Sequence, residues 1–186
     1  PGFEPLNLNA LQPDWYVGNG HKWLGAPRGT AFIWCHQDWL DRTETPIISH
    51  LYGQGFEAAY CRYGTIDFSA WASLPAAIQW YHRLEEAGAF RHARHLMSQH
   101  LAPIAAALGA EVITDPAETM MAAMLLPPSY TSDMMNPLRL ALQRVHDLVA
   151  VFVPWGQRLI ARLSTYGYND MEDFEAYQTA MLSTAP

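Results

Sequence analysis

The sequence predicts an α/β protein that ends in a small domain with helices on one face of a sheet. Runs of aromatic and β-branched residues bounded by Gly or Pro indicate strands, and longer segments with apolar residues every three or four positions indicate helices. From about Ala110 onward the two kinds of segment alternate, which is typical of a small α/β domain.

Two strands are expected near the N-terminus, at residues 14–18 (DWYVG) and 30–35 (TAFIWC). Both runs are aromatic and β-branched and lie beside Gly or Pro, so we expect two buried strands. The glycine-rich loop that joins them holds Lys22 between His21 and Trp23. Residues 43–55 follow no regular pattern, and residues 62–65 (RYGT) are turn-prone.

Two helices are expected in the middle of the chain. Ser69 can cap the first, which ends near Gly88. The second ends at Gly109 and contains Pro103, which should kink it. One apolar face of the second helix is formed by Phe90, Ala93, Met97, Leu101, Ile104 and Leu108.

The C-terminal domain is expected to contain strands at residues 111–114, 120–126, 151–153 and 159–163. Asn136 and Pro137 stand in the favoured order of a helix cap and first helical residue. Asp170 should cap a last helix that runs towards Leu182. One face of the helix after Asn136 carries Leu138, Leu142, Val145 and Val149.

Composition argues against several classes of protein. Eighteen acidic against eleven basic residues give a formal charge of -7, which disfavours binding to a phosphate backbone. No run approaches the roughly 20 apolar residues that span a bilayer. Cys35 and Cys61 have neither zinc-site nor disulfide-scaffold spacing. We therefore expect a soluble, cytoplasmic protein that binds neither nucleic acid nor membrane.

The first residues, PGFEP, lack an initiator methionine and read as an internal loop. From this pattern we expect a fragment whose upstream part is absent.

Lys22 is the first candidate for chemistry. A lysine amine attacks aldehydes readily when it is partly desolvated or lies near other cations, because its pKa then falls. His21 and Trp23 could shield it, and the glycines around it would let backbone approach a ligand. From spacing alone, however, a solvated lysine at the end of a strand is the favoured interpretation.

Two further sets of residues could bind anions. Arg62, Gly64 and Thr65 place a guanidinium, a backbone amide and a hydroxyl in one loop, which suits a phosphate, although an ordinary turn explains them as well. Arg162 follows an apolar run, so we expect it partly buried in a strand, where it needs an anion. A substrate carboxylate or an internal Asp or Glu would serve.

His92 and His95 lie three apart on a helix and could share a metal. No third ligand is close in sequence, and Arg91 and Arg94 oppose a cation, so a solvated helix face is favoured and no metal is predicted. Methionines at positions 120, 121, 124, 134 and 135 are expected to fill irregular core space or a boundary between strand and loop.

Three segments carry a resemblance to a known family. They are residues 14–24 (DWYVGNGHKWL) followed by residues 26–29 (APRG), residues 63–70 (YGTIDFSA), and residues 161–170 (ARLSTYGYND). In this order they resemble the lysine segment, the Gly-Thr-Arg-Asp-x-Ser-Ala loop and the Arg-hydrophobic-Ser-x-x-x-Tyr-Asn segment of class V aminotransferases. These belong to the pyridoxal-phosphate fold type I group, and the isopenicillin N epimerase-like subgroup is the most similar. Ile66 replaces the usual arginine of the second segment.

The resemblance implies a role for each segment. Lys22 would form a Schiff base with pyridoxal 5'-phosphate and move the α-proton of an amino-acid substrate. His21, Gly64 and Thr65 would help to hold the cofactor phosphate, the last two across the interface of a homodimer. Arg162 would bind the substrate α-carboxylate.

The resemblance also implies that the chain is the C-terminal part of a fold type I enzyme. Residues 1–70 would hold the last large-domain strands, residues 71–108 the connecting helices, and residues 109–186 the small α/β domain. The family's phosphate loop, the aromatic residue that stacks on the cofactor and the aspartate that pairs with the ring nitrogen all lie upstream of the lysine. This chain does not contain them, and no cysteine matches the desulfurase nucleophile.

We therefore expect the full-length protein to be an enzyme with epimerase, aminotransferase or lyase chemistry, and the isolated chain to be inactive. The alternative is a non-catalytic truncated or split subunit that needs an upstream partner segment to bind cofactor. A metal-binding module built on the histidines is a weaker third reading.

Overall fold

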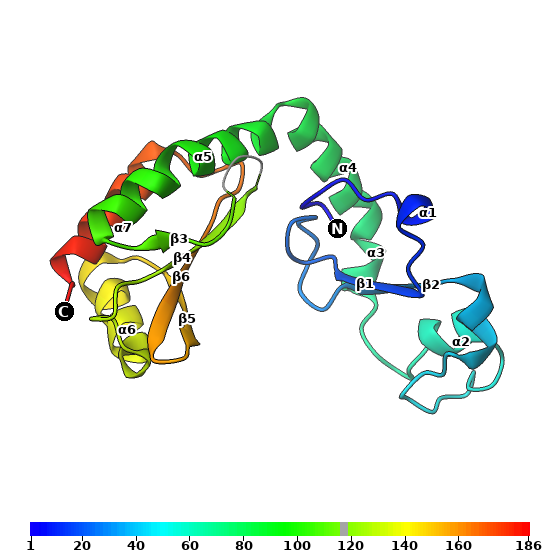
Figure 1. Ribbon diagram of the computed structural model, residues 1–186. Helices are drawn as coiled ribbons and strands as arrows, with labels where there is room; N and C mark the ends of the chain where they lie inside the picture. The colour runs from blue at the N-terminus through cyan, green and yellow to red at the C-terminus, as the bar shows by residue number, and fades with distance from the viewer. Residues whose placement is uncertain (116–118) are drawn as a thin grey trace. The chain divides into compact units, whose positions relative to one another are not determined.

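A computed structural model describes residues 1–115 and 119–186, which form two compact units, residues 1–83 and 84–186 (Figure 1). The boundary falls inside helix α4 (Leu74–Glu86). The three-part division expected from the sequence, at residues 70 and 108, stays a prediction. None of the helices in the described ranges is long and apolar enough to cross a bilayer.

The first unit is built on a two-stranded antiparallel ribbon, β1 (Trp15–Asn19) and β2 (Ala31–Cys35). Its register pairs Trp15 with Cys35 and Asn19 with Ala31. Both strands are where the sequence predicts them, but their expected burial is wrong, since the Val17 side chain is 66% exposed and that of Trp15 is 43% exposed. Two strands have two faces and two edges, and residues 1–83 cover them only in part.

The rest of the first unit consists of short helices. They are α1 (Leu8–Leu11), the 3-10 helix η1 (Gln37–Arg42), α2 (Phe56–Cys61), α3 (Ser69–Ala72) and α4. The prediction that Ser69 caps a helix is wrong, because Ser69 is the first residue of α3. Asp67 takes the role of the acceptor: its Oδ1 receives the Ser69 backbone N–H at 2.8 Å.

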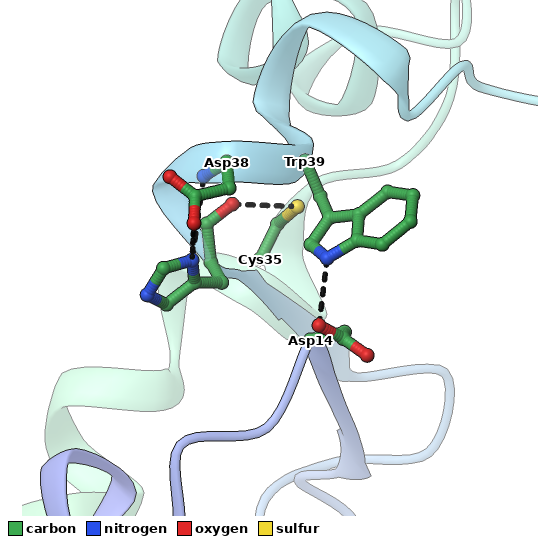
Figure 2. A network of polar contacts seen from close by, with 5 residues as sticks. Asp14, Cys35, Asp38 and Trp39 are labelled. Carbon is green, nitrogen blue, oxygen red and sulfur yellow. Dashed lines mark hydrogen bonds and ion pairs between the residues drawn. The ribbon is translucent and has the colours of Figure 1, made fainter.

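Polar contacts hold η1 on one end of the ribbon, as Figure 2 shows. The Trp39 indole N–H donates to Asp14 Oδ1 at 2.6 Å. The Trp15 indole N–H donates to Thr43 Oγ1 at 2.8 Å. The two indole rings lie 4.7 Å apart. Cys35, at the end of β2, is buried and donates its thiol to the His36 carbonyl at 3.5 Å. The bonds of Trp39 and Thr43 hold the segment after β2 against the start of β1.

The second unit is an antiparallel four-stranded sheet with helices on one face (Figure 1). The order of its strands is β3-β4-β6-β5. In chain order the elements are α5 (Ala89–Leu108), β3 (Glu111–Val112), β4 (Met121–Leu125), the 3-10 helix η2 (Ser132–Met134), α6 (Met135–His146), β5 (Val151–Trp155), β6 (Arg158–Ser164) and α7 (Met171–Ser183).

The core of the second unit lies between α5, α6 and α7 and one face of the sheet. The helices contribute Leu101, Leu142 and Met181, and the strands contribute Met124 and Leu159, each with 0% of its surface exposed. The expected packing of helices on one face is therefore confirmed, as is the burial of every residue expected on the apolar face of α5. Each buried aliphatic side chain of this size contributes about 1.5–3 kcal/mol.

Two helix ends of the second unit agree with the sequence and one does not. Gly109 ends α5 in the left-handed conformation, and Asp170 caps α7 in a reciprocal capping box with Asp173. Asn136, however, lies inside α6 instead of capping it. The expected apolar face is buried only at Leu138 and Leu142: Val145, in the last turn of α6, is 71% exposed, and Val149, beyond the end of the helix at His146, is 82% exposed.

Candidate functional site

Residues 20–30 form the loop that joins β1 to β2 and carries Lys22. Its neck is closed by backbone hydrogen bonds from Gly20 N to the Thr30 carbonyl and from Ala26 N to the Gly20 carbonyl, each 2.9 Å long. A tight turn follows at the tip, where Gly25 N donates to the Lys22 carbonyl at 3.0 Å. These hydrogen bonds hold the loop closed, and Lys22 lies two residues after Gly20, where the loop begins.

Lys22 is exposed and is the only lysine of the sequence. In the described part of the chain its side chain has no hydrogen bond or ion pair. Trp23 does not enclose the amine as expected: its ring packs against Phe3 at 4.9 Å. The first unit therefore offers one unpaired primary amine, held on a loop of defined geometry.

The lysine loop is packed against α4 and the N-terminal segment. A Cβ atom at Gly20 would lie 2.7 Å from Thr30 Oγ1 and 3.1 Å from Leu74 Cδ2, so only glycine fits there without a shift. A Cβ at Gly2 would lie 3.0 Å from both the Leu24 nitrogen and the ring of Tyr81. Close backbone approach at these two glycines fixes the loop on its support.

His21 points its Nδ1 atom to the Thr30 carbonyl oxygen, 3.1 Å away. Within the described residues its Nε2 atom has no partner. Thr30 itself is fully buried and donates its hydroxyl to the Pro27 carbonyl at 2.9 Å. Sequence reasoning did not select Thr30; the signal it missed is a hydroxyl residue directly before a strand, at the closing end of a glycine-rich loop.

The second candidate loop lies between α2 and α3. Gly64 has a φ of 117°, and a Cβ added there meets nothing within 4 Å, so its surroundings are open. Thr65 is exposed. The carboxylate of Asp67 has a lowered pKa, because the backbone N–H and then the side chain of Ser69 donate to it. The loop therefore carries an open glycine and an exposed threonine, and Asp67 follows two residues after Thr65.

An apolar hollow of about 690 Å³ in the first unit lies over the ribbon. Asn19 and Phe32 of the ribbon, Tyr60 of α2, and Tyr63 and Trp71 are among its walls. Burial raises the pKa of the Tyr63 hydroxyl. Asn19 at the end of β1 and Tyr63, directly before Gly64, thus line the same hollow. The expected site residues of this unit, His21, Lys22, Gly64 and Thr65, do not line it.

Arg162 lies on β6 in the second unit, as the sequence predicts, but it is exposed rather than partly buried. Strand residues alternate between faces, so Ala161 points into the core and Arg162 to the uncovered face, beside Ala123 and Val151 on the neighbouring strands. Among residues 1–115 and 119–186 no Asp or Glu pairs with it. The alternative that an internal Asp or Glu binds Arg162 therefore has no support within these residues.

His92, one of the two possible metal ligands, is engaged with backbone. Its Nε2 atom lies 3.1 Å from the Asn169 carbonyl. No group of three or more metal-ligating side chains occurs in the ranges described.

The model of the family described as aminotransferase class-V matches residues 2–177. Isopenicillin N epimerase of Streptomyces clavuligerus is 33% identical over 116 residues, which are 54% of this chain and 29% of that protein. A probable chloroplastic L-cysteine desulfhydrase of Arabidopsis thaliana is 29% identical over 87 residues, which are 45% of this chain and 18% of that protein. The chain thus spans less than a third of these relatives.

Among solved structures, the apo cysteine desulfurase of Thermococcus onnurineus NA1 is similar with a TM-score of 0.72 and 17% identity. The match covers 96% of this chain and 48% of that chain. The predicted fold class is confirmed: the chain is mixed α/β and matches part of a fold type I pyridoxal-phosphate enzyme over most of its length. With the family model matched over nearly all of its residues, the chain belongs to the class V aminotransferase family.

Proposed function

We propose that this chain is part of a pyridoxal-phosphate-dependent enzyme that acts on an amino acid, with Lys22 as the residue that binds the cofactor covalently. The observation that carries the proposal is the one lysine of the sequence, exposed on a closed loop within the family match. A covalent site for an aldehyde needs an accessible primary amine, and no other side chain of this chain has one.

The donor chemistry of the first unit fits such a cofactor. Lys22 Nζ and His21 Nε2 have no partner within the described residues, and Gly64 lies on an open edge. When bound, pyridoxal phosphate supplies an electron sink for negative charge at the substrate α-carbon. His21, Gly64 and Thr65 would hold the phosphate, and Lys22 Nζ would take up and return the α-proton.

Arg162 is proposed to bind the substrate α-carboxylate. Its exposed guanidinium has no carboxylate partner in the described ranges, so its donors are available for a bidentate anion.

The loop of Gly64 and Thr65 is proposed to act across the interface of a homodimer. Two free cysteines, Cys35 and Cys61, support a reducing, cytoplasmic location.

The reaction is proposed to be epimerisation, transamination or elimination. The names of the relatives include an epimerase and a cysteine desulfhydrase, so they do not single out one of the three. All three share one requirement, a base that removes the α-proton, and Lys22 Nζ is proposed for it in each case.

The alternative is that the chain needs a further polypeptide segment before it binds the cofactor. Its support is the thin core of residues 1–83, whose buried apolar side chains are Ala26, Cys35, Ala59 and Ala77. A preorganised cofactor site rests on packed supporting residues, and small side chains supply little of that packing.

Borohydride reduction tests the assignment of Lys22. The protein is incubated with pyridoxal phosphate and reduced, and the adduct is located by peptide mass spectrometry. We expect a stable phosphopyridoxyl group on the peptide that contains Lys22, and none in Lys22→Arg, which keeps the charge but lacks the primary amine. An adduct of equal yield in Lys22→Arg would refute the proposal.

A titration distinguishes a chain that binds the cofactor by itself from one that needs a further polypeptide segment. The 186-residue chain is titrated with pyridoxal phosphate and followed by its absorbance near the visible edge. A stoichiometric, saturable signal at low excess of cofactor would exclude the alternative. A signal that appears only at large excess, but on Lys22, would favour it.

A further inference from the structure

Thr30 uses its polar groups to close the loop that carries Lys22. Its hydroxyl and its backbone N–H both donate to the Pro27 carbonyl, at 2.9 Å and 3.4 Å. Its own carbonyl lies 2.9 Å from Gly20 N and 3.1 Å from His21 Nδ1. The side chain is fully buried. One residue therefore ties together the end of the loop, its beginning and the imidazole beside the lysine.

We propose that Thr30 is a positioning residue that holds His21 in the tautomer with the proton on Nδ1, so that Nε2 is the nitrogen that meets a ligand. A carbonyl oxygen only accepts hydrogen bonds, so Nδ1 must be the donor in this contact. A neutral imidazole carries one N–H, which leaves a lone pair on Nε2. When the ring is protonated, the Nδ1–H bond to Thr30 is kept and the new proton sits on Nε2.

The hydroxyl of Thr30 is what holds this carbonyl in place. It anchors residue 30 to Pro27, and Gly20 packs so closely on it that a Cβ there would lie 2.7 Å from Oγ1. Valine has the same shape without the hydroxyl, and would leave the Pro27 carbonyl with only the long 3.4 Å bond. Serine keeps the hydroxyl.

The proposal rests on the proposed function only for the task of Nε2, which faces the ligand held beside Lys22. The tautomer itself is a property of the chain without cofactor. Failure of the borohydride test would leave the tautomer standing, and a wrong tautomer would leave Lys22 as a covalent site.

The test is two-bond ¹H–¹⁵N correlation spectroscopy of the 186-residue chain labelled at its histidines, at about pH 8, where an ordinary imidazole is neutral. His21→Gln and His92→Gln variants assign the two signals. We expect the Nδ1–H pattern for His21 and the opposite, Nε2–H pattern for His92, whose Nε2 faces the Asn169 carbonyl. An Nε2–H or averaged pattern for His21 would overturn the proposal.

The role of Thr30 is read from variants. Thr30→Val is expected to give an averaged His21 tautomer and about fivefold faster amide exchange at Gly20, as the loss of one buried hydrogen bond implies. Thr30→Ser should retain the wild-type pattern. Thr45→Val removes another buried threonine hydroxyl of the same unit and should leave His21 unchanged.

If Thr30→Val does not fold, Gly20→Ala serves in its place, because its Cβ displaces the Thr30 hydroxyl without deleting it. We expect the same averaging of the His21 signal. A pure Nδ1–H pattern in a folded Thr30→Val or Gly20→Ala protein would show that the hydroxyl does not position His21.

Discussion

At the scale of single residues, a buried tyrosine couples stability to alkaline pH. Tyr177 on α7 is 5% exposed, and burial, followed by the nearby Tyr130 hydroxyl, raises its pKa well above the ordinary value of 10.0. The folded state thus holds the proton more tightly than the unfolded state. Its contribution to stability is complete below about pH 10 and is lost as the pH rises beyond that value.

Substitution of Tyr177 by Phe should therefore flatten the alkaline limb of the stability curve. The free energy of unfolding is measured by urea denaturation between about pH 8 and pH 11. We expect the wild-type protein to lose more stability over this range than Tyr177→Phe. Tyr168→Phe, at a side chain that is 81% exposed, is the control and should follow the wild type. Equal slopes in all three proteins would contradict the assignment.

The sequence selects candidate residues by motif, but it says less about the environment of each side chain. Lys22 and Arg162 stand out because their motifs lie in order along the chain, and the roles expected for them stay predictions. Their surroundings were predicted less well: Trp23 packs on Phe3 instead of covering Lys22, and Arg162 is exposed. Burial depends on which segments pack together, and the short motifs around these two residues do not specify those segments. Thr30 was missed for the same reason, since its partners Gly20 and Pro27 meet it only in the folded loop.

At the scale of elements, the N-terminus of α7 is a self-contained capping box. Asp170 Oδ1 accepts the backbone N–H groups of Glu172 and Asp173 at 2.9 Å and 3.3 Å, and Asp173 Oδ2 accepts the Asp170 N–H at 3.2 Å. All of these contacts lie within four consecutive residues. This is why the start of α7 could be predicted from the sequence alone.

Asp170→Ala should destabilise the second unit by about 1 kcal/mol, because two backbone donors lose their acceptor. Thermal unfolding followed by far-ultraviolet circular dichroism would measure the effect. Asp170→Asn keeps an acceptor oxygen and is expected to lose about half as much or less. An alanine variant as stable as the wild type would show that water replaces the cap without cost.

Other elements depended on longer-range contacts and were predicted only in part. The strands β1 and β2 follow from their aromatic and β-branched runs, and most of the buried face of α5 follows from its helical period. Leu96 and Ala105 are also buried on α5 and were not predicted. The short helix α2 has no comparable period, and Asp67 rather than Ser69 receives the hydrogen bond at the start of α3. Helices of four to six residues give too few positions for a helical period to be recognised.

At the scale of the whole molecule, the two units differ in how much large apolar surface they bury. All of the fully buried large side chains of the described residues except that of Thr30 belong to residues 84–186. The buried side chains of residues 1–83 are small: Ala26, Thr30, Cys35, Thr45, Ala59 and Ala77. A unit with so little buried apolar area has little to offset the conformational entropy lost on folding. The first unit is therefore expected to be the less stable of the two.

Urea denaturation of the 186-residue chain should show this difference. Six of the seven tryptophans lie in residues 1–83, so their fluorescence reports the first unit, while circular dichroism reports mainly the long helices of the second. We expect the fluorescence midpoint at the lower urea concentration. Leu159→Ala should lower the free energy of unfolding of the second unit by about 2–5 kcal/mol. The circular dichroism midpoint should therefore fall, while the fluorescence midpoint stays unchanged. Coincident transitions that move together in this variant would contradict two separate units.

The single lysine on its closed loop makes the protein its own spectroscopic probe. A sample grown with isotope-labelled lysine contains one labelled side chain, so its nuclear resonance spectrum shows one Nζ environment with no assignment step. The same peak would report the ionisation of the amine, its reaction with any carbonyl compound and the motion of residues 20–30. Screening of aldehydes and keto acids against this chain then needs neither a known substrate nor an assay of turnover.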